Sequence, residues 1–139
     1  MELKMRFRTK KSLCHRSTER ILLALRLLVL LPSLQVAGVL GVGLLMYGGQ
    51  WSVGKLLMHC VAGVTYAVGP ILPSSVYSHR SCLYAVLVCC ALVLMYAHSI
   101  IPSDINAYEA DRMRLWASVP LVVVMFSAVL YAREASKRA

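Results

Sequence analysis

Residues 21–46 read ILLALRLLVLLPSLQVAGVLGVGLLM, an apolar run whose single charged residue is Arg26. A helix needs ~20 apolar residues to cross a hydrocarbon core of ~30 Å. Because the backbone must satisfy its own hydrogen bonds in lipid, such a run predicts a helix. Three more apolar runs follow, at residues 55–72, 82–101 and 115–131. The sequence therefore predicts an all-α, polytopic membrane helix bundle of about four transmembrane helices.

The composition supports a membrane protein over a soluble one. The hydrophobic fraction is 59% and the mean hydropathy is +0.68, more apolar than is usual for a soluble domain. We expect a basic N-terminal arm at residues 1–20 and a transmembrane helical domain with a short tail at residues 21–139. Four spans leave no room for a soluble catalytic domain, so we expect no catalysis by this chain alone.

The positive charge lies at the two ends of the chain. Seven of the 15 lysines and arginines fall in residues 1–20, and three more in residues 133–138. Such a distribution orients a protein in the membrane, with its basic segments on one side. It predicts both termini on the same side, contact with membrane lipids, and no nucleic-acid partner.

Several local features refine this picture. The basic arm is expected to be extended or to lie on the membrane surface, with Ser17 or Thr18 capping the first helix. Pro32 is expected to kink that helix. Arg26 can reach back to the positive surface, or pair with a partner subunit or an anionic headgroup.

Two sets of small side chains are expected to serve packing. Glycines at positions 38, 41 and 43 lie within an apolar span, where small residues let helices approach closely. They lack the strand that precedes a nucleotide-binding loop, so that interpretation is rejected. The cysteines at positions 60, 82, 89 and 90 are expected to be buried thiols without a disulfide framework.

His59 is the candidate functional residue because an ionisable ring inside an apolar run is a functional hypothesis by default. Ala62 and Gly63 follow three and four positions later, on the same helical face. Small residues one turn away would leave room for a haem whose iron the imidazole binds. The alternative is a polar ring that is hydrogen-bonded to a neighbouring helix. His98 is expected to cap a helix end or meet water, although pairing with His59 is conceivable, and His79 is expected in a solvated loop or, alternatively, at a headgroup or quinone pocket.

A resemblance gives these residues a context. Residues 12–20, SLCHRSTER, followed by an apolar run with Leu31-Pro32, resemble the entry to the first membrane helix in the small cytochrome b subunit of mitochondrial succinate dehydrogenase, or respiratory complex II. That family carries a haem histidine with a glycine four positions later, which His59 and Gly63 match. Tyr96 through Leu115-Trp116 is also similar to that family.

The resemblance implies a membrane-anchor subunit of succinate–ubiquinone oxidoreductase in the mitochondrial inner membrane, with both termini on the matrix side. It implies haem b shared with a larger cytochrome b anchor subunit, His59 as an axial ligand of the haem iron, and ubiquinone as substrate. The further partners would be an iron–sulfur subunit and a flavoprotein subunit. In that family an Asp-Tyr pair follows the haem histidine, and its tyrosine hydroxyl helps hold the quinone carbonyl. Pro70-Ile71 replaces this pair here. Tyr66 or Tyr77 would then lie near the quinone, unless a partner subunit supplies the hydrogen-bond donor.

Two other functions are compatible with the same pattern. A supernumerary structural subunit of a respiratory-chain complex would have the same topology without its own cofactor. A small membrane transporter would need buried charges or broken helices along its path. The middle parts of residues 82–101 and 115–131 lack charged residues, which makes a transporter the weaker alternative.

Overall fold

The protein is helical throughout the part of the chain that its structure, a computed structural model, describes. The backbone is described for residues 2–101 and 106–136, and the side chains for residues 19–101, 106–134 and 136. The long helices are α1 (Glu2–Tyr47), α2 (Val53–Val68), α3 (Arg80–Ile100) and α4 (Ala107–Ser136). Three short 3-10 helices connect them, namely η1 (Gly48–Gln50), η2 (Gly69–Ile71) and η3 (Ser74–Ser78). The predicted all-α class is confirmed.

Three of the helices are long and apolar enough to cross a membrane, in the segments Glu19–Gln50, Arg80–Ile100 and Ala107–Glu134. The prediction of about four spans therefore needs correction. α2 has 16 residues, which at ~1.5 Å per residue gives about 24 Å, short of the ~30 Å core. The helix ends at Val68, immediately before Gly69-Pro70, and proline has no N–H to donate.

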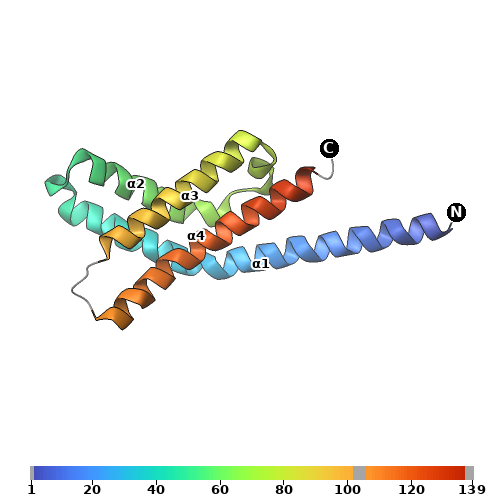
Figure 1. The fold of residues 1–139 in the computed structure, drawn as a ribbon, viewed down its shortest axis with the longest axis horizontal. Helices are drawn as coiled ribbons and strands as arrows, with labels where there is room; N and C mark the ends of the chain where they lie inside the picture. The colour runs from blue at the N-terminus through green and yellow to red at the C-terminus, as the bar shows by residue number, and fades with distance from the viewer. Residues whose placement is uncertain (1, 102–105, 137–139) are drawn as a thin grey trace.

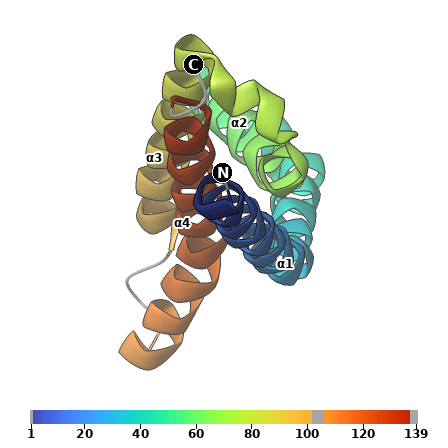
Figure 2. The ribbon, with the colours of Figure 1, turned by 90° about the vertical axis from the view of Figure 1, so that its right-hand side faces the viewer.

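Successive long helices run in alternate directions, so the start of α1 and the end of α4 lie towards the same end of the molecule (Figure 1). α1 is the longest, and its first part projects well beyond the other helices. Turned by 90°, the ribbon shows α4 between α3 and α1 (Figure 2). α2 lies on the same side of α4 as α1. α1 packs against both α2 and α4, and α3 packs against α4.

The N-terminal arm is a continuation of α1 rather than an extended segment. The helix begins at Glu2 and is continuous to Tyr47, so Ser17 and Thr18 lie within it and do not cap its start. Residues 2–31 contain no glycine or proline and several good helix formers, which explains why no earlier break occurs. The helix also continues through Pro32.

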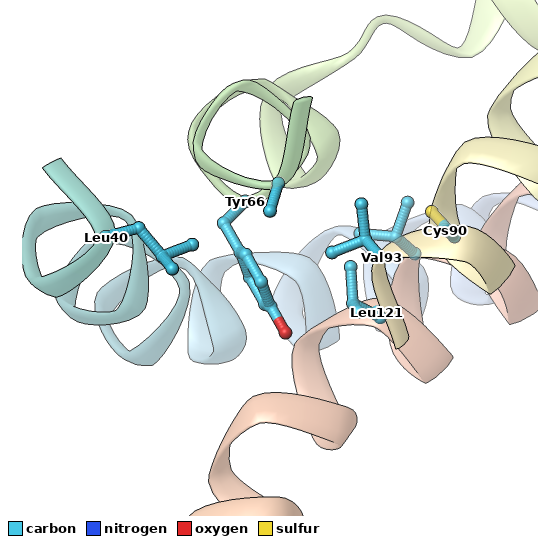
Figure 3. Packing of buried hydrophobic residues seen from close by; sticks show 7 residues of the cluster. Leu40, Tyr66, Cys90, Val93 and Leu121 are labelled. Carbon is cyan, nitrogen blue, oxygen red and sulfur yellow. The ribbon is translucent and has the colours of Figure 1, made fainter. Parts of the chain in front are cut away.

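The core brings together side chains from all four long helices. Leu40 of α1, Tyr66 of α2, Cys90 and Val93 of α3, and Leu121 of α4 pack in one cluster (Figure 3). Each of these is at least nine-tenths buried. The helices are thus held together by one apolar centre, as ordinary helix packing requires.

The cysteines are less buried than their sequence environment indicates. Cys90 is buried and Cys89 is half-buried, but Cys60 and Cys82 are exposed on the surface of the chain. An apolar run predicts a span but not which of its faces turns inward. The outward faces of a membrane helix are apolar as well, so these two thiols lie on the outer surface.

Candidate functional site

His59 lies in the first half of α2 and points into the bundle. α2 starts after Ser52, whose side-chain oxygen accepts a hydrogen bond from the Lys55 backbone N–H at 3.4 Å. The His59 side chain is 8% exposed. Its Nδ1 atom is hydrogen-bonded to the Tyr96 hydroxyl of α3, and the Trp51 ring lies 4.3 Å away between centroids.

The second ring nitrogen of His59 faces α1. A Cβ atom added at Gly43 would lie 3.8 Å from His59 Nε2 and 3.8 Å from the Trp51 ring. Gly43 therefore lets α1 come close to the imidazole, which is the packing role expected of small residues in membrane helices. Gly38 and Gly41 border open space instead, so that role is confined to Gly43.

Haem ligation by His59 stays a prediction, and part of this geometry suits an axial ligand. A ligating histidine binds iron through one nitrogen and orients its ring through a hydrogen bond from the other. In this chain Nδ1 is held by Tyr96, and the Nε2 side is covered by α1 at Gly43 and by Trp51. Gly63 borders open space, and the Nε2 atom of His59 has no hydrogen-bond partner among the described residues. The hydrogen bond to a neighbouring helix that the alternative requires is present at Nδ1, and it is compatible with either interpretation, because a ligating histidine also bonds through its second nitrogen.

The two other histidines whose side chains the structure describes, His79 and His98, do not contact His59. His98, in the last turn of α3, bonds through Nε2 to the Ser118 hydroxyl of α4 at 3.1 Å. His79 precedes α3 without a capping side-chain hydrogen bond and is exposed. Among the residues described, no three His, Cys, Asp or Glu side chains gather to hold a metal ion.

The two tyrosines expected near a quinone are used within the bundle. The Tyr66 hydroxyl donates to the Ala117 carbonyl of α4 at 2.6 Å, and Ser33 of α1 donates to the Tyr66 carbonyl. The Tyr77 hydroxyl accepts from Arg26 at 3.2 Å. Each tyrosine is 1% exposed. Their hydroxyls therefore fasten parts of the bundle together in this structure, and the Tyr66 side chain also lines an apolar cavity between the helices.

Arg26 forms the second polar centre of the bundle, which we call the Arg26 clamp: Arg26, Tyr77, Tyr131 and the carbonyls of Gly69 and Leu72. The Arg26 side chain is 6% exposed. Its Nη2 atom donates to the Leu72 carbonyl at 2.7 Å and the Gly69 carbonyl at 3.2 Å. The expectation that Arg26 would reach the surface, a partner or a headgroup is therefore corrected.

Aromatic rings complete the Arg26 clamp. The Tyr77 and Tyr131 rings are stacked, 6.0 Å apart and 5° from parallel. The guanidinium carbon lies 5.7 Å from the Tyr77 centroid and 5.8 Å from that of Tyr131, within the range of cation–π attraction. Burial raises the pKa of the Tyr77 phenol, and the Arg26 charge opposes that rise, so Tyr77 stays a neutral partner.

The sequence contained one signal for this clamp. Arg26 is the single charge in its apolar run, and residues 69–73 (GPILP) interrupt the second run. A helix end leaves carbonyl groups without intrahelical partners, and a cation is favourable beside them. Nothing in the spacing, however, showed that these two segments meet.

Comparisons of this chain with protein-family models, with curated proteins and with solved structures find no match.

Proposed function

We propose that this protein is a membrane-anchor subunit, which holds a water-soluble partner at the membrane through the projecting part of α1. The observation that carries this proposal is the continuity of α1, which runs as one helix from Glu2 through the first candidate span to Tyr47. One continuous helix forms both the projection and part of the bundle. A partner bound to the projection would therefore be held at a fixed position relative to the bundle. An extended arm would not fix a partner in this way.

The dimensions and charge of the projection suit this role. Residues 2–18 precede the first candidate span and, at ~1.5 Å per residue, reach about 25 Å from it. The 20 N-terminal residues carry seven of the 15 lysines and arginines. A basic helix of this length favours a partner with an acidic surface. Three candidate spans, with most of their surface outward, provide the attachment to lipid.

The partner that we propose follows from the sequence resemblance. SLCHRSTER at residues 12–20 resembles the small anchor subunit of succinate dehydrogenase, so the soluble partners would be its iron–sulfur and flavoprotein subunits. The membrane would then be the mitochondrial inner membrane, with the projection on the matrix side. Haem ligation by His59 stays part of this proposal: its Nδ1 atom is hydrogen-bonded to Tyr96, and its Nε2 atom has no hydrogen-bond partner among the described residues.

The test is purification in mild detergent, followed by identification of the proteins that remain bound. A flavoprotein and an iron–sulfur protein in the preparation would support the proposal. Their absence, with the bundle intact by circular dichroism, would overturn the succinate dehydrogenase assignment.

A charge-neutralised projection tests the anchoring role separately. Glutamine keeps helix propensity but removes charge, so the variant changes five basic residues to Gln: Lys4, Arg6, Arg8, Lys10 and Lys11. The control changes Lys137 and Arg138 to Gln. We expect the first variant to lose its soluble partner and the control to keep it. Retention by both would show that the basic projection is not the anchor.

A second candidate is a structural subunit of a different respiratory-chain complex, without a cofactor of its own. The hydrogen bond between His59 and Tyr96 is compatible with it, because a core histidine without a cofactor also needs such a partner. The same purification separates the two, since this candidate would bring down other redox proteins.

A further inference from the structure

An apolar cavity opens between the helices on the face where α1, α3 and α4 meet. Its volume is about 370 Å³, and all four long helices contribute to its wall. Val36 and Leu40 of α1, Ala62 of α2 and Ala97 of α3 line its inner part. Cavities of about 300 Å³ or more with apolar walls are typical binding sites for small ligands.

A second hollow of about 680 Å³ adjoins the first cavity. The two share Gln35, Val39, Met113 and Trp116, so they form one continuous depression. The outer hollow adds the side chains of Glu109 and Arg112. The depression therefore has an apolar interior and a polar mouth.

The mouth presents both signs of charge. Glu109 and Arg112 lie three positions apart on α4, on neighbouring parts of one helix face, and both are exposed. Among the described residues neither side chain forms an ion pair with the other, whereas nearby Arg114 bonds to Asp111 at 3.1 Å. The Glu109 carboxylate and Arg112 guanidinium are thus both directed to the hollow as separate charges.

The Gln35 amide adds an uncharged polar group. It lies inside the first candidate span, at the boundary between the apolar interior and the mouth. A polar side chain in a membrane helix requires a hydrogen-bond partner. A ligand with carbonyl groups between its apolar and charged parts would supply one.

We propose that this depression binds a zwitterionic glycerophospholipid. The acyl chain occupies the apolar cavity, the phosphate bonds to Arg112, the head-group ammonium lies beside Glu109, and an ester carbonyl accepts from Gln35. Phosphate and guanidinium match in geometry and charge. An anionic lipid would place a head group of net negative charge beside the Glu109 carboxylate. The opposite charges of Glu109 and Arg112 therefore favour a zwitterionic head group. This site is independent of the proposed anchoring function.

The test is native mass spectrometry of the full chain taken from vesicles that contain equal amounts of a zwitterionic phosphatidylethanolamine and an anionic phosphatidylglycerol. We expect the zwitterionic lipid to be retained preferentially. Arg112→Gln and Glu109→Gln should each lower its retention about tenfold, the effect of losing one charge-assisted contact. Arg114→Gln, outside the hollow, is the matched control and should not change retention.

A steric pair of variants tests the location. Val39 lines both hollows and is 72% exposed, so Val39→Trp fills the mouth without disturbing the core. Val42, 56% exposed on the same helix and away from the hollow, gives the control Val42→Trp. Loss of bound lipid in the first variant alone supports the site. Equal retention in both variants, equal loss in both, or preference for the anionic lipid would overturn it.

Discussion

Substitution of Arg26 by methionine should destabilise the bundle by about 3 kcal/mol, because it removes the donor of the Arg26 clamp. Two backbone carbonyls, at 2.7 and 3.2 Å from Nη2, would lose their Arg26 hydrogen bonds. We assign about 1 kcal/mol to each carbonyl. We add about 0.5 kcal/mol for the Tyr77 hydroxyl, in line with hydrogen bonds measured in membrane bundles, and about 0.5 kcal/mol for the stacked rings.

The conservative variant Arg26→Lys separates charge from geometry. All three hydrogen bonds of Arg26 come from Nη2, so an ammonium can keep the charge and part of the donation, but it lacks the planar group that stacks on rings. We expect about half of the loss, roughly 1.5 kcal/mol, from this variant. Arg114→Gln breaks an exposed pair with Asp111 and should change stability by less than about 1 kcal/mol.

The assay is unfolding of the purified protein in mixed micelles with increasing sodium dodecyl sulfate, followed by tryptophan fluorescence of Trp51 and Trp116. A loss of about 3 kcal/mol lowers the folding equilibrium constant by about two orders of magnitude. A loss for Arg26→Met no larger than that of the Arg114 control would refute the reasoning. Equal losses for Arg26→Met and Arg26→Lys would refute the part that depends on charge.

Three further predictions follow from the surroundings of His59 and from the thiols. In a double-mutant cycle with Tyr96→Phe, His59→Ala should show a coupling of about 1 kcal/mol in unfolding free energy, and additive effects would argue against their hydrogen bond. Gly43→Ala should be tolerated within about 0.5 kcal/mol because the added Cβ meets only ordinary 3.8 Å contacts, while Gly43→Leu should destabilise by about 1–3 kcal/mol through overpacking. In native micelles a small maleimide should label Cys82 well before Cys90, since Cys82 is exposed and burial limits access to Cys90; equal labelling rates would contradict the packing of α3.

The helical class and the approximate helix positions could be predicted from the sequence because they depend on local composition. The third apolar run, at residues 82–101, corresponds to α3 at Arg80–Ile100. The second run was apolar over residues 55–72, but the α-helix stops at Val68. Apolar composition continued past the helix end because η2 and its following turn are also buried in part, so hydropathy alone did not mark the boundary.

The candidate site was less predictable because its contacts join residues far apart in the chain. The spacing of His59 and Gly63 describes one helix face, but the orientation of that face depends on where Tyr96 of α3 and Gly43 of α1 pack. Only the folded bundle shows that the face with His59 turns inward. A lone histidine in an apolar run is compatible with both outcomes.

α2 is short, and one of the two buried polar centres of the bundle lies just past its C-terminal end. At about 24 Å this helix ends inside a hydrocarbon core of ~30 Å, so the carbonyls beyond its C-terminus would meet lipid rather than water. Arg26 of α1 donates to the carbonyls of Gly69 and Leu72 just past that end, and its charge is favourable there. Towards the other end of α2, His59 is fixed to Tyr96. The Arg26 clamp therefore satisfies carbonyl groups at the C-terminal end of α2, and the single arginine in an otherwise apolar run has a structural cause.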